Sequence, residues 1–419
     1  MQTLWDAAAN GHIERLRQLI DENANLDAKD KYGRTALMWA VWDGKYDCAQ
    51  LLVNAKANLD ASDDDGCTAL QWATCYRKTD CTQLLVDAKA DLDAKNNRGK
   101  TALILAVFDD DSDLPPLWVD PEENMRIDAR AIVAYYRLHA NYNSSADCAQ
   151  LLVDAKADLD AKDDDGKTAL MWAAEGSHTD CVQLLVDAKA DLDAKDREGR
   201  TALMCAAEEG QTDCDCAQLL VVANADPDAK DEDGRTALMW AALRGHTACA
   251  QLLVDAKADP DAKDEDGETA LMRAARGGHT ACIKLLVDAK ANLDAKDKDG
   301  KSALIKAAVN RKIDCARLVL EAKANIHTKD DDGNTAVMLA VYNGIAAVML
   351  AVYDGNTDDY TDLVQLLVDA RADILSTNRQ GRNALMLAAQ GGYNACVELL
   401  LTQDAYFYID RDGDVPFLL

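Results

Sequence analysis

Three pairs of histidine and cysteine have the spacing of metal ligands on a helix. They are His178 and Cys181, His246 and Cys249, and His279 and Cys282. Residues three apart share a helical face, so each pair could offer two ligands to one ion. A tetrahedral zinc site needs four ligands about 2.0–2.3 Å from the metal. Neighbouring helices, about 8–10 Å apart, stand too far away to complete the set, so the spacing favours structural histidines.

The chain has thirteen cysteines, and nine of them recur at one position of a repeated pattern. These nine are Cys48, Cys81, Cys148, Cys181, Cys216, Cys249, Cys282, Cys315 and Cys396. Equivalent positions in packed helices lie about 8–10 Å apart, whereas a disulfide needs Cα atoms within about 7 Å. We therefore expect buried, reduced thiols in a reducing compartment.

Runs of three aspartates before a glycine resemble a calcium loop at first sight. The runs end at Gly66, Gly166 and Gly333. An EF-hand needs an acid or amide five residues before its glycine and a glutamate six residues after it. Around Gly166 these positions hold Ala161 and Trp172. A solvated acidic edge is the favoured interpretation, and weak, diffuse cation binding stays open.

The composition points away from catalysis, nucleic acid and membranes. No phosphate-binding glycine loop with lysine, nucleophile elbow or kinase signature occurs. The 419 residues carry a net charge of −29, which repels phosphate backbones and anionic bilayers and attracts basic partners. The first residues lack a signal peptide, and the most apolar run, 345–353, is too short to span a bilayer. We expect a cytoplasmic protein with no cofactor.

A repeated phrase, Asp-Gly-x-Thr-Ala-Leu-Met, shows which elements position these residues. Its glycine, here called the turn glycine, stands at Gly33, Gly66, Gly99, Gly166, Gly199, Gly234, Gly267, Gly300, Gly333, Gly381 and Gly413. Most steps are 33 residues, a period typical of a solenoid whose units stack to bury their apolar faces. Positions below are counted from the turn glycine.

One repeat shows how each unit is expected to fold. The sequence around Gly234 predicts a turn, and Thr236 can cap a short helix over 237–242. A break at 245–247 precedes a second helix over 248–256. Neither helix can bury its apolar face alone, so the units must stack.

These units resemble those of the ankyrin-repeat family. The family's core, T-P-L-H-x-A-A, here reads Thr236-Ala237-Leu238-Met239-Trp240-Ala241-Ala242, and its Gly-His pair begins at Gly11, Gly245 and Gly278. The resemblance covers nearly the whole chain. It implies an all-α repeat solenoid, a right-handed stack of ankyrin-type helix-turn-helix units with hairpin-like turn tips. It also implies a non-enzymatic protein that binds other proteins.

At one corner the repeats depart from the family. The glycine expected after the second helix is mostly lysine, at Lys56, Lys89, Lys156, Lys189, Lys257, Lys290 and Lys323. A lysine in the left-handed conformation reduces stability. We therefore expect another backbone geometry at this corner.

The repeats predict three segments in the chain. Residues 1–29 form an N-terminal capping half-repeat, and residues 30–410 form ten ankyrin-type repeats. Residues 411–419 form a truncated C-terminal repeat or a cap, because a solenoid needs covered ends.

Two insertions interrupt the repeats. One lies at about 108–146, where a helix can run from Asp120 to about Asn141. It is either a partner contact or a tolerated surface elaboration. The other lies at about 343–361, where the run 336–344 recurs as 347–355.

Positions that vary between repeats are candidates for binding. With the leucine at position +4 as zero, the alanines at +7 and +8 lie near −60° and +40°, at about 100° per residue. Position +6 lies near 200°, on the side that lines the concave groove of ankyrin proteins. This column holds Trp39, Trp72, Leu105, Trp172, Cys205, Trp240, Arg273, Lys306, Leu339 and Leu387. Its tryptophans predict either an exposed binding ridge or indoles packed together.

The sequence therefore predicts a partner-binding surface on the concave face and turn tips. Its residues are Trp39, Trp42, Trp72, Tyr76, Trp172, Trp240, Leu243, Arg244, Arg273, Arg276 and Lys306. We expect a two-part ligand, with an apolar or helical segment over the tryptophans and an acidic segment near Arg273 and Lys306. The partner should be a protein with a basic surface, bound by a monomer. Two other functions stay open: a structural spacer, and the regulatory array of a larger protein whose effector domain is absent here.

Overall fold

The computed structural model describes residues 3–107, 144–210, 214–341 and 358–407. Within them the chain consists of α-helices joined by turns, and the only β-type pairing is an isolated bridge between Lys329 and Thr335. The prediction of an all-α repeat solenoid is confirmed. No helix in these ranges has the length and apolar character needed to cross a bilayer.

Three sequence predictions fall outside the described residues. They concern most of the insertion at 108–146, the second copy of the tandem at 347–355, and the C-terminal segment 411–419. The second helix after each insertion is described, and begins at Ser144 and Asp358 respectively.

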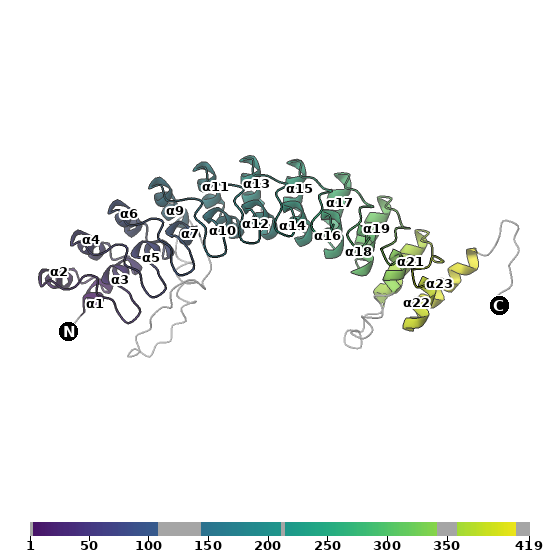
Figure 1. The fold of residues 1–419 in the computed structure, drawn as a ribbon, viewed down its shortest axis with the longest axis horizontal. Helices are drawn as coiled ribbons and strands as arrows, with labels where there is room; N and C mark the ends of the chain where they lie inside the picture. The colour runs from purple at the N-terminus through teal and green to yellow at the C-terminus, as the bar shows by residue number, and fades with distance from the viewer. Residues whose placement is uncertain (1–2, 108–143, 211–213, 342–357, 408–419) are drawn as a thin grey trace. The chain divides into compact units, whose positions relative to one another are not determined.

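The chain divides into two compact units. The N-terminal unit comprises Met1–Glu209 and Asp215–Asp226, and the C-terminal unit comprises Gly210–Cys214 and Pro227–Leu419. Within each unit the first helices of successive repeats form one row and the second helices form another (Figure 1).

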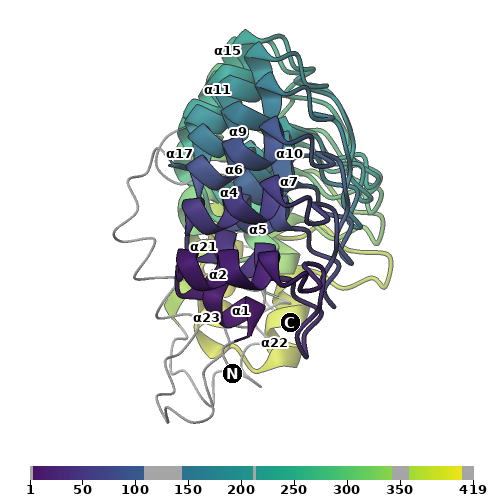
Figure 2. The same cartoon turned by 90° about the vertical axis from the view of Figure 1, so that its left-hand side faces the viewer.

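The N-terminal unit begins with the predicted half-repeat. Its first helices are α1 (Leu4–Ala9), α3 (Ala36–Trp42), α5 (Ala69–Cys75), α7 (Ala102–Val107), α10 (Ala169–Glu175) and α12 (Ala202–Glu209). Its second helices are α2 (Ile13–Asp21), α4 (Tyr46–Asn54), α6 (Thr79–Asp87), α9 (Ser144–Asp154), α11 (Thr179–Asp187) and α13 (Asp215–Val222). Seen from the N-terminal end, the turn loops of this unit lie along the edge away from the second helices (Figure 2).

The C-terminal unit repeats the same helix pair. Its first helices are α14 (Ala237–Arg244), α16 (Ala270–Gly277), α18 (Ala303–Val309) and α22 (Ala384–Gly391), and residues 336–341 are also helical. Its second helices are α15 (Thr247–Asp255), α17 (Thr280–Asp288), α19 (Ile313–Glu321), α21 (Asp358–Asp369) and α23 (Asn394–Phe407).

Threonine caps begin most of the first helices. The Thr168 hydroxyl accepts a hydrogen bond from the backbone N–H of Met171 at 3.4 Å, and Thr236 and Thr269 cap their helices in the same way. Helices this short are unstable alone in water. Packing between repeats must therefore stabilise them.

Leucine and cysteine columns form the core of each unit. Leu37, Leu70 and Leu170, at position +4, are completely buried. Burying one such side chain contributes about 1.5–3 kcal/mol. All nine column cysteines are buried, as predicted, and all thirteen cysteines are free thiols.

Hydrogen bonds join the turns of neighbouring repeats. In the N-terminal unit, the Arg197 N–H donates to the Asp165 carbonyl at 2.9 Å. The Asp191 N–H donates to the Asp160 carboxylate at 2.8 Å. Because such bonds recur from repeat to repeat, the turn loops are ordered by their neighbours as well as by their own sequence.

The predicted change of geometry at the lysine corner is wrong. All seven lysines after the second helices are left-handed, with φ between 62° and 73°. At Lys257 the backbone N–H donates to the Val254 carbonyl, and the Ala258 N–H donates to the Leu253 carbonyl. This is the Schellman motif, and buried Ala258 and Leu253 supply its apolar contact. These contacts hold lysine where glycine is usually preferred.

The left-handed lysines should therefore be sites where glycine stabilises the protein. A non-glycine residue in this conformation costs about 1–2 kcal/mol, partly offset by the greater freedom of glycine in the unfolded chain. We expect Lys257→Gly to raise the free energy of unfolding by about 0.5–1 kcal/mol in urea titrations. Lys257→Ala is the matched control and should give no gain, because it keeps the Cβ. Equal gains in both variants would show that the lysine charge, and not the backbone, matters.

Candidate partner-binding surface

In most repeats an aspartate at position −3 organises the turn, and buried Asp163 shows how. Its Oδ1 accepts hydrogen bonds from the backbone N–H groups of Asp165 at 3.0 Å and Lys167 at 2.9 Å. Its Oδ2 accepts a hydrogen bond from the indole N–H of Trp172, at position +6, at 2.8 Å. One carboxylate thus shapes the turn and ties it to the first helix.

The other column tryptophans make the same bond. Trp39, Trp72 and Trp240 donate to Asp30, Asp63 and Asp231 at 3.1, 2.9 and 3.2 Å. Burial raises the pKa of Asp63, although hydrogen bonds from Cys67 and Trp72 oppose the rise. A buried carboxylate in this position needs its hydrogen-bond donors, because leaving a buried polar group without a partner destabilises the fold by about 1–3 kcal/mol.

Repeats without a donor at position +6 satisfy the carboxylate in another way. Where Cys205 occupies position +6, Arg200 Nε donates to Asp196 Oδ2 at 3.0 Å. Where Leu339 occupies it, the side-chain amide of Asn334 donates to Asp330 at 3.1 Å.

The two remaining repeats replace the aspartate itself. Leu105 is preceded by Asn96, and Leu387 by Asn378, at position −3. The Asn96 side-chain oxygen still accepts bonds from the backbone N–H groups of Arg98 and Lys100 at 3.0 Å. The second carboxylate oxygen is absent, and so is the donor. Position −3 and its donor therefore vary together along the chain.

This arrangement favours packed indoles over an exposed ridge. Trp72 is 3% exposed and Arg273 is 5% exposed, so both are buried. Trp39, Trp172, Trp240 and Lys306 are half-buried. A helical wheel places position +6 opposite the core of one helix, but it omits the turn, and these long side chains reach back to the turn of their own repeat.

An aromatic cluster, defined as Trp39, Trp42, Trp72 and Tyr76, lies on α3, on α5 and on the residue that follows α5. The Trp42 ring meets Trp39 edge-on at 5.5 Å and Tyr76 edge-on at 6.4 Å, and Trp72 lies 5.7 Å from Tyr76. Edge-to-face pairs at these distances are favourable. The Arg34 guanidinium lies 5.4 Å from the Trp39 ring and 5.0 Å from the Trp72 ring, so a cation links the tryptophans of two neighbouring repeats.

Trp172 is the centre of a smaller group in the same unit. Lys167 Nζ lies 4.0 Å and Lys100 Nζ 4.6 Å from the centre of its ring. Both lysines are buried, and Lys167 also pairs with Glu175. The Trp172 ring is therefore covered by cations as well as bonded to its turn.

The predicted cationic end of the column lies in the C-terminal unit and is already paired. Lys306 Nζ lies 2.5 Å from Glu268 Oε1 and 2.6 Å from Asp297 Oδ2. Burial alone would lower the pKa of Lys306, but its hydrogen bonds to Asp297 and Glu268 outweigh burial and raise it. Lys306 is thus held as a charged donor to its own turn, as the tryptophans are.

Arg273 and Arg276 complete an ion-pair network with these groups. Arg273 pairs with Asp264, its own turn aspartate, and Arg276 lies 3.2 Å from Glu268. Three cations and three carboxylates, those of Asp264, Glu268 and Asp297, therefore neutralise one another. The expected attraction of an acidic ligand segment to Arg273 and Lys306 has no support in this charge distribution.

Leu243 and Arg244 end the first helix of the Trp240 repeat. Leu243 is half-buried and Arg244 is exposed. The Leu243 carbonyl lies 2.9 Å from the His279 ring nitrogen Nε2, which explains a structural histidine at the junction between helices. Among the described residues, no three His, Cys, Asp or Glu side chains come together as metal ligands would.

The sequence of the repeats decides the family. The sequence profile of ankyrin repeats, in its three-copy form, matches residues 1–63, 55–114, 137–214, 213–297, 289–353 and 348–416. These segments span most of the chain. The chain belongs to the ankyrin-repeat family.

Two named proteins show the likeness. A 47-residue stretch of this ankyrin-repeat protein is 43% identical to the ankyrin repeat domain-containing protein SAT10 of Stachybotrys chartarum, and covers 11% of this chain and 2% of SAT10. The crystal structure of the ankyrin repeat domain of Bcl-3, a member of the IκB protein family, aligns with a TM-score of 0.48 and 28% identity. That alignment covers 57% of this chain and 99% of the Bcl-3 domain.

Ankyrin repeats are generally protein–protein interaction modules and are generally non-catalytic. In this ankyrin-repeat protein the residues that sequence reasoning missed are the turn aspartates, Arg34 and Glu268. The signal for the aspartates was present, because an aspartate stands nine residues before every tryptophan, arginine or lysine at position +6. Nothing in the sequence marks Glu268, which meets Lys306 of the next repeat only after folding.

The pairing of turn aspartate and donor predicts a strong coupling between two substitutions. Trp172→Leu alone should lower the free energy of unfolding, because Asp163 Oδ2 loses its donor, by about 1–3 kcal/mol in addition to lost packing. Asp163→Asn/Trp172→Leu recreates the natural Asn96–Leu105 combination. The double variant should be more stable than the sum of the single effects by about 0.5–3 kcal/mol in urea titrations.

A control cycle pairs Asp163→Asn with Trp42→Leu in a distant repeat. Those two effects should add within about 0.3–0.5 kcal/mol. Additivity in the Asp163–Trp172 cycle as well would mean that their hydrogen bond does not stabilise the turn.

Burial of the cysteine column predicts slow reaction with thiol reagents. Burial, and then the neighbouring Asp80, raise the pKa of Cys81 to about 11, and burial with Asp314 does the same for Cys315. Because thiolate is the reactive form, only about one such thiol in a thousand is ionised at pH 8. We expect labelling at pH 8 to be slow in the native protein and complete in denaturant. Half-buried Cys214 is the internal reference, and column cysteines that label as fast as Cys214 would contradict burial.

Proposed function

We propose that this ankyrin-repeat protein is a non-catalytic scaffold that binds a partner protein through its first helices and turn tips. The observation that carries the proposal is one contiguous group of aromatic side chains in the N-terminal unit, which runs from exposed Tyr32 to half-buried Trp42 and Tyr76. The Arg34 guanidinium lies 4.9 Å from the ring of Tyr32, on the turn tip, and 5.0 Å from Trp72 in the aromatic cluster. Aromatic and arginine side chains dominate the binding energy of protein interfaces.

Within the cluster, Trp42 and Tyr76 are the residues best suited to bind. Neither occupies position +6, so neither holds a turn aspartate. Both are half-buried, and Tyr32 on the adjacent tip is 36% exposed. A partner that covers them would desolvate aromatic surface without breaking a turn. Trp39 and Trp72 would support this contact from below, because their indoles are fixed by Asp30 and Asp63.

The C-terminal unit would add a polar contact. Arg244 is exposed, and the Arg276 side chain is 38% exposed. Leu243 and Trp240 are half-buried and would flank the contact. Arg273 and Lys306 serve their own turns, so we assign them a positioning role and drop the acidic segment of the ligand.

The partner should be a protein with a basic surface. The net charge of −29 would steer such a partner toward the chain and slow the approach of nucleic acid or anionic membranes. Free thiols support a cytoplasmic, reducing environment, and the same charge favours a monomer by self-repulsion.

The proposal predicts that binding and stability separate within the aromatic residues. Trp42→Ala should weaken partner binding by about 2 kcal/mol, or about thirtyfold, and change the free energy of unfolding less than Trp172→Ala does. The measurement is a titration of a partner first captured by the wild-type chain, with the fraction folded determined for each variant.

The comparison with Trp172→Ala is the control, because Trp172 holds Asp163 and should mainly affect stability. Unchanged affinity per folded molecule in Trp42→Ala and Tyr76→Ala would overturn the role of the aromatic cluster. A chain that captures no partner at all would favour the structural spacer.

A further inference from the structure

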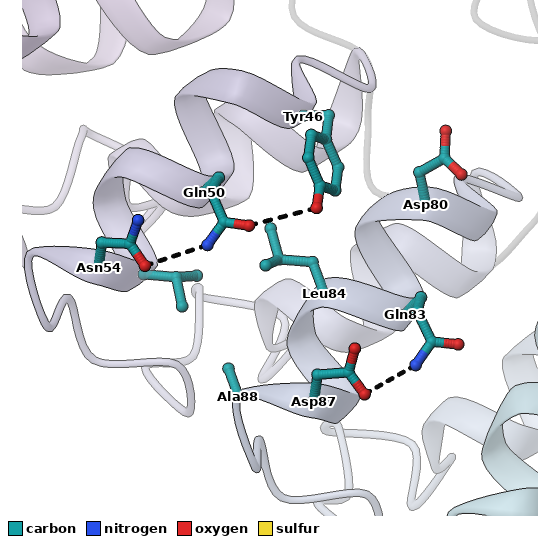
Figure 3. Close-up of a pocket in the computed structure, with 9 residues that line it drawn as sticks. Tyr46, Gln50, Asn54, Asp80, Gln83, Leu84, Asp87 and Ala88 are labelled. Atoms are coloured by element: carbon teal, nitrogen blue, oxygen red, sulfur yellow. Dashed lines mark hydrogen bonds between the residues drawn. The ribbon is translucent and has the colours of Figure 1, made fainter.

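A groove runs between two second helices of the N-terminal unit, in the layer that does not carry the aromatic cluster. It has a volume of about 490 Å³ and lies between α4 and α6. Tyr46 and Gln50 of α4 and Asp80, Leu84 and Asp87 of α6 line it (Figure 3). Val53 of α4 also lines it. These residues recur every three or four positions, so the groove follows one face of each helix.

The groove has an apolar middle and polar ends. Leu84 and half-buried Val53 supply the apolar part. Asp80 and Asp87 are exposed and stand seven residues apart on α6, which is about 10.5 Å along the helix. Its lining includes these two carboxylates and no cation. Lys78 and Lys89 flank α6 in the sequence but do not line the groove.

An exposed aromatic ring forms one rim. Tyr46 is 41% exposed, and its hydroxyl donates to Gln50 Oε1 at 3.2 Å. The Gln50 amide in turn donates to Asn54 Oδ1 at 3.1 Å. This chain of hydrogen bonds, drawn in Figure 3, fixes the ring beside the groove.

Neighbouring second helices show that this rim departs from the pattern of the repeats. The position of Tyr46 holds Thr79 in α6, Ala146 in α9 and Thr179 in α11. The position of Asn54 holds Asp87, Asp154 and Asp187. Packing of second helices therefore requires neither the tyrosine nor the asparagine, and both face the same groove.

We propose that this groove binds a basic amphipathic helix of a partner protein. Arginine or lysine at positions i and i+7 of that helix would pair with Asp80 and Asp87, which have the same spacing. Apolar residues at i+3 and i+4 would cover Leu84 and Val53. The cation near Asp80 would also lie against the Tyr46 ring. Charge complementarity favours this occupant over a second copy of the acidic chain.

The proposal is independent of the aromatic cluster and is tested with a defined probe. The probe is a fluorescein-labelled helical peptide with arginine at positions 1 and 8, leucine at 4 and alanine at 5 of its central segment. Its anisotropy is titrated with the full chain at low salt. A peptide with glutamate in place of both arginines should not bind.

Substitutions in the groove should weaken binding of the probe, whereas substitution of an acidic residue elsewhere should not. Asp80→Asn and Asp87→Asn should each weaken binding about two- to fivefold, and Tyr46→Thr by a similar factor. Asp187→Asn, at the position equivalent to Asp87 in α11, and Trp42→Ala should leave it unchanged. Thermal melts check the fold, which Tyr46→Thr should retain because α6 and α11 carry threonine there.

Four outcomes would overturn the proposal. No saturable binding of the arginine peptide would show that the groove does not take this ligand. Equal losses in Asp87→Asn and Asp187→Asn would mean attraction to the overall charge. A loss confined to Trp42→Ala would place the probe on the aromatic cluster. A dimer of the free chain that Tyr46→Thr dissociates, measured by sedimentation, would identify a second copy as the occupant.

Discussion

The residue at position −3, an aspartate in most repeats, is the group on which the rest of the repeat depends. Buried Asp163 accepts two backbone N–H groups from its own turn and an indole N–H from the first helix. A buried charge is tolerated only with such partners. The requirement explains why Asp196 accepts a hydrogen bond from Arg200, and Asp330 one from Asn334. It also explains why position −3 is asparagine, Asn96, in a repeat with leucine at position +6. The turn and the donor are therefore one structural unit, repeated along the chain.

This constraint separates residues that hold the repeat from residues that remain available to a partner. Position +6 attracts attention because it carries tryptophan, arginine and lysine, the residues that often dominate interfaces. Here those side chains serve the turn first, and Arg273 and Lys306 are neutralised within the C-terminal unit. Trp42 and Tyr76 do not occupy position +6 and do not bond to a turn aspartate. Tyr46 is a tyrosine where equivalent second helices have threonine or alanine, so packing of these helices does not require it. The surfaces proposed to bind therefore carry residues that are not needed for the packing of one repeat against the next.

Much of the fold follows from the sequence because it depends on local and periodic features. The 33-residue period, the threonine caps and the cysteine column are all visible when the repeats are compared in sequence. The left-handed lysines were not predicted, because Ala258 and Leu253 in the Schellman contact outweigh the intrinsic preference for glycine. The burial of Trp72 was missed because a helical wheel represents one helix only. It omits the turn whose Asp63 accepts the indole hydrogen bond. Glu268 became visible only in the fold, since its partner Lys306 lies 38 residues further along the chain.

Hydrogen–deuterium exchange of the turn amides tests the central claim most directly. The amides of Asp165 and Lys167 lie in a surface turn but are bonded to Asp163, and the equivalent amides of Asp65 and Cys67 are bonded to Asp63. If the buried aspartates organise the repeats, these amides should exchange as slowly as those of the adjoining helices, through opening of whole repeats. Exchange within seconds, as in an ordinary surface loop, while the helices stay protected, would contradict the account.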